Sequence, residues 1–301
     1  MTSNVAWLRD ARLVQERAAR RRSRARLSRR AVVQIVLIAI VVVFAAPYIW
    51  ALSSALKPEG QLFTYPPQII PHPITFANFS TLFGSFPFAR WLLNSVIITS
   101  LYVVGAVVSC SMAAYAFARL HWPGRDLMFG LTVASMILPY QVTMVPLYLI
   151  FRHLGWVNTW YPLWVPAWFG VPFYIFLLRQ FFRTLPREIE EAASVDGAGR
   201  IRTFISVVLP MSRPALATVA VFAMMFEWSD FVGPLIYIQS PQRMPLSLGL
   251  QFLNTNQQML GQQLWGVLMA GSVVTLLPML IVFFALQKHF VRGITLGALR
   301  G

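Results

Sequence analysis

The sequence predicts an all-α, polytopic membrane protein with six transmembrane helices and a short cytoplasmic helix between the fourth and fifth. Three observations predict this class: the composition, the spacing of long uncharged runs, and the placement of arginine. Of 301 residues, 57% are apolar and 12% are charged, about half the charged share of a typical soluble domain. A single soluble core of this length cannot bury so many apolar side chains, so lipid must cover some of them.

The first three spans are predicted from runs that contain no charged residue. A membrane-crossing helix needs about 20 mostly apolar residues. Residues 31–56, 91–118 and 127–151 each satisfy this requirement, and we expect one span in each. The first run exceeds the apolar stretch of a cleaved signal peptide, so it is predicted to be a retained helix.

The last three spans follow the same argument with more polar interruptions. In residues 153–178 the apolar part starts near Trp160, which places the fourth span. The fifth begins after Pro214 and runs to about Tyr237. The uncharged stretch from 244 to 287 begins with many glutamines and asparagines, so the sixth span is expected to start near Leu264. Residues 31–287 thus form the predicted transmembrane domain.

The basic residues predict the orientation of the spans. With the N-terminus inside, 21 of the 25 Lys and Arg residues fall in cytoplasmic segments, and only Lys57, Arg90, Arg152 and Arg243 lie outside. This asymmetry follows the positive-inside rule. Both termini are therefore predicted to be cytoplasmic.

The segments flanking the spans have distinct compositions. Residues 1–30 hold ten arginines against Asp10 and Glu16, a basic tail that suits anionic lipid. No aromatic and basic surface accompanies it, so nucleic-acid binding is not expected. Residues 288–301 are a predicted cytoplasmic C-terminal tail. The outer loop at 57–90 is rich in proline, which disfavours regular helix, and we expect an ordered cap there.

The cytoplasmic loop at about 185–214 predicts a short helix outside the bilayer. Pro186 suits a helix start, and the glutamates that follow complement the positive end of a helix. Ile189, Ala192 and Ala193 recur at helical spacing and predict one flat face. Gly197 supplies a turn, and a second short helix is expected to resume as far as Leu209. Such a helix fits a groove on another protein, although an ordinary interfacial helix has the same composition.

This loop resembles the "EAA" loop of ABC importer permeases. The run Glu191-Ala192-Ala193, then Gly197, then Leu209-Pro210 stands at the spacing of that family, with Val207 where isoleucine is commoner. The resemblance implies the type I ABC importer permease fold and a coupling helix that docks into an ATP-binding subunit. The implied residues of this coupling loop are Glu191, Ala192, Ala193, Asp196, Gly197, Leu209 and Pro210. Of these, Glu191 is expected to contact the ATP-binding subunit and Gly197 to allow the turn.

Further patterns resemble the second permease subunit of maltose-type sugar importers. They include Asn94-Ser95, the run from Ala114 to Leu120, and the stretch 290–298. The resemblance implies import of a sugar in a bacterial inner membrane. It also implies four partners: a second, homologous permease subunit, two ATP-binding subunits, and a solute-binding protein on the outer face.

The chain itself carries no predicted catalytic or cofactor site. There is no G-x-x-x-x-G-K-[ST] phosphate-binding loop, so ATP and magnesium are expected to bind to the partner subunits. The four histidines are scattered, without the paired spacing of metal ligands. We therefore predict a non-catalytic transport subunit.

Two acids interrupt the fifth span. Glu227 and Asp230 flank Trp228, and carboxylates within a membrane usually face a bundle interior or a water-filled path. They are candidates for lining a transport pathway, or for joining helices by hydrogen bonds. They are also the only support for the alternative function, a self-sufficient secondary transporter or channel driven by an ion gradient. Glycerol-phosphate and amino-sugar cargoes stay open beside an oligosaccharide.

Overall fold

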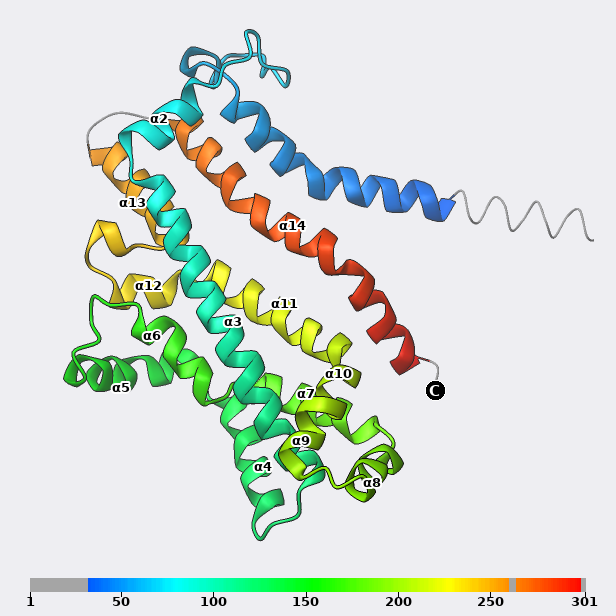
Figure 1. Cartoon of the computed structure of the whole chain (residues 1–301). Helices are drawn as coiled ribbons and strands as arrows, with labels where there is room; N and C mark the ends of the chain where they lie inside the picture. Colours follow the sequence, from blue (N-terminus) through cyan, green and yellow to red (C-terminus); the bar gives the residue numbers. More distant parts are fainter. Residues whose placement is uncertain (1–31, 260–263, 299–301) are drawn as a thin grey trace, which may run out of the picture.

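The computed structural model describes residues 32–259 and 264–298, and every regular element in these ranges is helical (Figure 1). A helix over Val32–Ala55 comes first. The helices after it are α2 Ala77–Ser85, α3 Phe88–Arg119, α4 Arg125–Ala134, α5 Tyr140–His153, α6 Tyr161–Trp164, α7 Pro172–Thr184, α8 Arg187–Val195, α9 Arg200–Thr203, α10 Leu209–Met211, α11 Arg213–Ser229, α12 Val232–Tyr237, α13 Leu246–Met259 and α14 Trp265–Ala298.

The long helix α3 is the central element of the bundle. It packs along α7 and α11 through small side chains, among them Ala106, Cys110 and Ala114, all fully buried. Gly105 continues this face, and a Cβ added there would collide with the Trp168 ring. Small residues of this kind let helices approach closely in a membrane.

Within the described residues, four helices are long and apolar enough to cross a membrane, and two bent helix pairs raise the number to six if each pair is one span. The third predicted span, over 127–151, is sharply bent. Residues Arg125–Ile137 and Tyr140–His153 form two helices at 103° to each other. Pro139 explains the break, because the residue before a proline avoids helical geometry, and Leu138 is extended with ψ of 114°.

The fifth segment also differs from its prediction. The helix α11 ends at Ser229, and Asp230 is extended with ψ of 125° before α12 begins. The apolar run to Tyr237 is therefore two helices and not one. The sixth span begins at Trp265, as predicted, and α14 runs without interruption to Ala298, past the predicted boundary at 287.

The outer loop at 57–90 is an ordered segment, but it contains a helix that the proline content did not predict. All of α2 lies in a stretch without proline, after Pro73 and before Pro87. Asn78 on α2 is buried and donates to the carbonyls of Ala55 and Lys57, both at 2.8 Å. These bonds fix the loop to the end of the first helix.

Lys57 completes this outer junction as a buried cation. Its side chain is 1% exposed, donates to the Gln68 carbonyl, and lies 4.6 Å from the centre of the Trp50 ring. Loss of hydration lowers the pKa of Lys57 below its ordinary value. Carbonyl and ring contacts partly replace the lost water.

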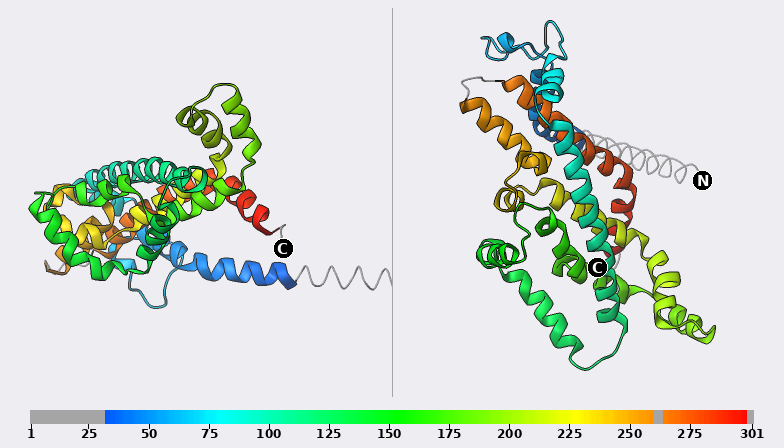
Figure 2. Two further views of the ribbon diagram at one scale, coloured as in Figure 1. Left: turned by 90° about the horizontal axis from the view of Figure 1, so that it is seen from below. Right: turned by 60° about the vertical axis from the view of Figure 1, so that its left-hand side comes forward.

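The first helix stands apart from the remaining helices over most of its length (Figures 1 and 2). Its apolar window has no residue buried within the chain, and side chains such as Phe44 and Val43 are exposed. The predicted basic tail at 1–30 lies outside the described residues.

Candidate functional site

The predicted short helix of the cytoplasmic loop is α8, at the end of α3 opposite α2 (Figure 1). Pro186 immediately precedes it in an extended conformation, and Glu188 and Glu190 occupy its first turn. Acids at this end are favourable because the first N–H groups of a helix are unpaired. With the segment that follows, α8 projects to one side of the bundle (Figure 2).

Gly197 ends α8 by a defined backbone motif. Its φ of +78° is left-handed, a conformation that side chains with a Cβ rarely adopt. The Gly197 N–H donates to the Ser194 carbonyl at 3.0 Å, and the Ala198 N–H to the Ala193 carbonyl at 2.9 Å. This is the Schellman pairing of a helix C-terminus.

The second half of the loop is helical but irregular. After α9, residues Phe204–Val208 form a π-helical turn that leads into α10. Pro210 has no N–H, so the Ser206 carbonyl lacks its usual donor four residues on. Leu209 is half-buried and Pro210 exposed. The chain then bends by 79° at Ser212 as it enters α11.

One side of α8 faces the bundle and the other is open. Ile189, Glu190 and Ala193 are half-buried, whereas Glu191 and Ala192 are exposed. The predicted single face of Ile189, Ala192 and Ala193 is therefore split, because neighbouring helical residues point about 100° apart. Two further side chains of this loop, Val195 and Asp196, also lie on the open side.

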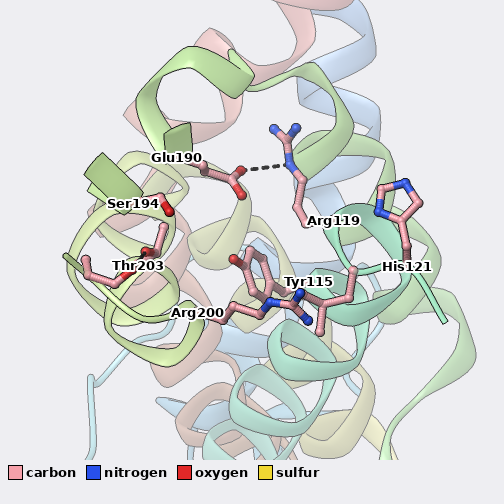
Figure 3. Close-up of a pocket in the computed structure, with 9 residues that line it drawn as sticks. Tyr115, Arg119, His121, Glu190, Ser194, Arg200 and Thr203 are labelled. Atoms are coloured by element: carbon pink, nitrogen blue, oxygen red, sulfur yellow. Dashed lines mark hydrogen bonds and ion pairs between the residues drawn. The ribbon is translucent and has the colours of Figure 1, made fainter. Parts of the chain in front are cut away.

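An ion pair fastens α8 to the end of α3. Arg119 Nε lies 2.9 Å from Glu190 Oε1, with side-chain exposures of 6% and 19% (Figure 3). Arg119 Nη2 also donates to the Leu185 carbonyl at 2.6 Å. The same guanidinium thus holds the residue just before Pro186 and a side chain in the first turn of α8. The Nε–Oε1 contact is a charge pair without hydrogen-bond geometry, whereas the bond to Leu185 has a charged donor and is stronger than a neutral one.

A polar cavity of about 180 Å³ lies between α3, α8 and α9. Figure 3 shows the Arg119–Glu190 pair on one side, with Tyr115 and Arg200 close to each other below it. No group of three potential metal ligands occurs in the part of the chain that the structure describes. The residues that line the cavity are Tyr115, Arg119, Leu120, His121, Glu190, Ser194, Ala198, Arg200 and Thr203.

Arg119, Glu190 and Tyr115 were not among the predicted site residues. Arg119 appeared in the sequence as the end of an apolar run, and Glu190 as one of three helix-start acids. Their shared cytoplasmic side was a signal, since a basic helix end and an acidic loop lay on the same face. Which of several arginines pairs with Glu190 could be determined only from the structure.

The second predicted cluster lies away from the coupling loop, around the junction of α11 and α12. Glu227 and Trp228 are each 7% exposed. The indole of Trp228 donates to the Thr275 carbonyl on α14 at 3.1 Å. The carboxylate of Asp230 accepts from the Gly233 N–H at 3.2 Å, which caps α12. The Trp228 bond joins α11 to α14, whereas the Asp230 bond stays within the turn that starts α12. Pathway lining by Glu227 and Asp230 stays a prediction.

Comparison with known proteins places these features in context. The profile of the family described as "Binding-protein-dependent transport system inner membrane component" matches residues 105–296. An osmoprotective-compound uptake permease protein of Synechocystis sp. is 32% identical over 278 residues, covering 89% of this chain and 91% of that protein. The trehalose/maltose transport system permease protein of Thermococcus litoralis is 31% identical, with coverages of 90% and 96%.

A solved structure shows the same fold. It is a bacterial ABC transporter involved in import of the acidic polysaccharide alginate, and one of its chains superposes with a TM-score of 0.78. The identity is 23%, and the match covers 86% of this chain and 96% of that one. At this identity the likeness concerns the fold, which agrees with the predicted type I importer architecture.

Proposed function

Because this chain belongs to the family of inner membrane components of binding-protein-dependent transport systems, we propose that it is the permease subunit of an ATP-driven importer for a carbohydrate. The observation that carries this proposal is the cytoplasmic helix α8. It lies between the fourth and fifth spans, is fastened to α3 on one side, and leaves Glu191 exposed on the other. That open side is where an ATP-binding subunit would dock.

A carbohydrate is the proposed cargo on two grounds. The maltose-type sequence patterns extend over most of the chain, and a relative 31% identical is a trehalose/maltose permease protein. The osmoprotective-compound permease protein shows that the family admits other small solutes. We expect a sugar or a sugar derivative, delivered by a solute-binding protein.

The proposed assembly has five components. This chain pairs with a second, homologous permease in a bacterial inner membrane, with both termini cytoplasmic. Two ATP-binding subunits, which bind ATP and magnesium, dock below, and the solute-binding protein docks above. The exposed first helix and the apolar outer surface of α14 are covered by lipid and by the second permease.

In the proposed mechanism, α8 is the helix through which the ATP-binding subunits move this subunit. Closure of the ATP-binding subunits around ATP would move α8 and switch the bundle from inward-facing to outward-facing. Binding-protein docking must then favour the same closed state, because coupling between two sites is reciprocal. The secondary-transporter alternative assigns no role to this loop and is not supported by the family.

The test is affinity purification of the complex from membranes. The wild-type chain is expected to bring down an ATP-binding subunit and a second permease, whereas Glu191→Lys and Gly197→Pro should lose the ATP-binding subunit or its transport coupling. Glu59→Lys, which makes the same charge change at an exposed residue of the outer loop, should behave as wild type. A wild-type chain that purifies alone and still transports would refute the proposal.

A separate test addresses Glu227 and Asp230. If they join helices and do not contact the cargo, replacing them together by Gln and Asn keeps their shapes and their hydrogen-bonding atoms. Transport in proteoliposomes should then stay within about twofold of wild type, since each group keeps an acceptor oxygen. A selective rise in the KM for cargo, with normal assembly, would assign them to the pathway.

A further inference from the structure

Among the described helices, α3 connects the two ends of the subunit. Its 32 residues span about 48 Å at 1.5 Å per residue, more than the roughly 30 Å of a bilayer's hydrocarbon core. One end lies beside α8, and the other lies beside the short segment 241–246, far from α8 (Figure 1). Because α3 is one uninterrupted α-helix, a displacement at one end can be passed to the other.

Arg119 at the inner end of α3 fastens α8 through Glu190, and α8 also packs against α9 and the π-helical turn. The chain on each side of α8 is interrupted: Leu185 is extended with ψ of 140°, and Gly197 has a left-handed turn. Beyond Gly197, the π-helical turn and the 79° bend at Ser212 separate α8 from α11. Movement of α8 therefore reaches the bundle poorly along the backbone. The Arg119–Glu190 pair bypasses these interruptions.

A ring contact supports this inner attachment. The Tyr115 ring, one turn before Arg119, lies 4.9 Å from the ring of Phe204, which begins the π-helical turn. The end of α3 thus contacts the loop both before and after Gly197. Both contacts come from residues that are at least half-buried.

The outer end of α3 holds the segment 241–246 equally closely. The Trp91 indole donates to the Pro241 carbonyl at 2.8 Å. The Asn94 amide donates to the carbonyls of Gln242 at 2.9 Å and Met244 at 2.8 Å. The Ser95 hydroxyl accepts from the Leu246 N–H at 2.7 Å. The α3 residues involved are all less than 5% exposed.

We propose that α3 carries movement of α8 to the outer segment 241–246, and that Arg119, through Glu190, is the positioning residue for this transfer. This inference rests on the proposed function, because it takes α8 as the docking helix. It adds a route and a fastening residue to that function. Without the ion pair, α8 still binds its partner, but less of its displacement is passed to α3.

The experiment measures the accessibility of the outer segment 241–246 while nucleotide binds to the ATP-binding subunits on the other side of the membrane. Gln242→Cys places a label at an exposed side chain, and the single native cysteine, Cys110, is buried. The complex is reconstituted in nanodiscs, and the rate of maleimide labelling is measured with and without a non-hydrolysable ATP analogue with magnesium. The Gln242→Cys complex is expected to show a nucleotide-dependent rate.

The variants are built in this Gln242→Cys background. Glu190→Gln and Arg119→Lys should each reduce the nucleotide-induced change at least about fivefold, the lower limit of typical couplings between linked sites, while the ATP-binding subunits stay bound. The double variant Arg119→Glu with Glu190→Arg should restore part of it. The control is Asp126→Asn, which breaks an ion pair of the same 2.9 Å length whose carboxylate is 75% exposed. It should leave the response unchanged.

Two results would overturn the inference. One is an undiminished nucleotide response in both Glu190→Gln and Arg119→Lys. The other is loss of the ATP-binding subunits from both variants, which would assign the pair to assembly. Failure of the proposed function looks different, because the Gln242→Cys chain would then bind no ATP-binding subunit even with the ion pair intact.

Discussion

Asn94 offers a quantitative test of the outer attachment. The substitution Asn94→Leu keeps a side chain of similar size but removes the amide that bonds to the Gln242 and Met244 carbonyls. Asn94 is 3% exposed, so water does not replace the lost donor at its own position. The segment 241–246 should loosen while α3 itself stays helical.

The expected cost follows from the two bonds. A hydrogen bond contributes about 0.5 to 1.5 kcal/mol net to stability, so Asn94→Leu should lower the free energy of unfolding by about 1 to 3 kcal/mol. The neighbouring residue provides a control on the same helix. Leu93 is 57% exposed and faces away from the segment, so Leu93→Ala should cost less than about 0.5 kcal/mol.

The assay is unfolding of the purified complex in mixed micelles by increasing SDS, followed by tryptophan fluorescence. Asn94→Leu should unfold at a lower SDS fraction than wild type, and Leu93→Ala near the wild-type midpoint. If Asn94→Leu and wild type unfold with free energies within about 0.5 kcal/mol, below the net value of even one such bond, the two bonds do not hold this segment and the argument for a fixed outer end of α3 fails.

Three further substitutions test other parts of the structure. Gly197→Ala places a residue with a Cβ in the left-handed region, which costs about 1 to 2 kcal/mol. Trypsin should therefore cleave the free subunit at Arg200 about 5 to 30 times faster than wild type. An unchanged cleavage rate would contradict the turn geometry. Gly105→Ala drives a methyl group into the Trp168 ring and should destabilise the bundle by about 1 to 3 kcal/mol. Adding Trp168→Ala should relieve part of the clash in a double-mutant cycle. If the free-energy changes of the two substitutions simply add, the contact is not supported. Asp230→Ala removes the side-chain oxygen that accepts from the Gly233 N–H at the start of α12. The free energy of unfolding, measured by the same SDS titration, should fall by about 0.5 to 2 kcal/mol. Asp230→Asn keeps an acceptor oxygen, so an equal fall in that variant would exclude capping as the reason.

Local signals in the sequence predicted the elements whose geometry is decided locally. The helix α8 starts after Pro186 and ends before Gly197 because its acids, its alanines and the glycine act within a few residues of one another. The spans over Val32–Ala55 and Phe88–Arg119 were likewise predictable, since apolar length alone determines them.

The elements that were mispredicted depend on the placement of proline within a run. Counting apolar residues over 127–151 predicted one span but not the sharp bend at Pro139, between α4 and α5. The proline content of 57–90 predicted no regular helix, whereas α2 forms in the stretch between Pro73 and Pro87, which contains no proline. In both cases the composition of the whole segment was a poor guide, because the positions of individual prolines determine where helices break or form.

The site could be predicted only in part, because its contacts join distant segments. Glu191 and Gly197 belong to one local pattern. The pairing of Arg119 with Glu190, however, depends on how α3 packs along α7 and places its end beside α8. No spacing in the sequence selects Arg119 as the partner over Arg125, which pairs with Asp126.

The first helix is attached at its outer end and is otherwise uncovered by its own chain. Its 24 residues are about 36 Å long, longer than the roughly 30 Å of an average hydrocarbon core. A helix with this mismatch tilts or thickens the surrounding lipid, at a cost that depends on bilayer thickness. We therefore expect bilayer thickness to influence the tilt of this helix, because few contacts within its own chain hold it.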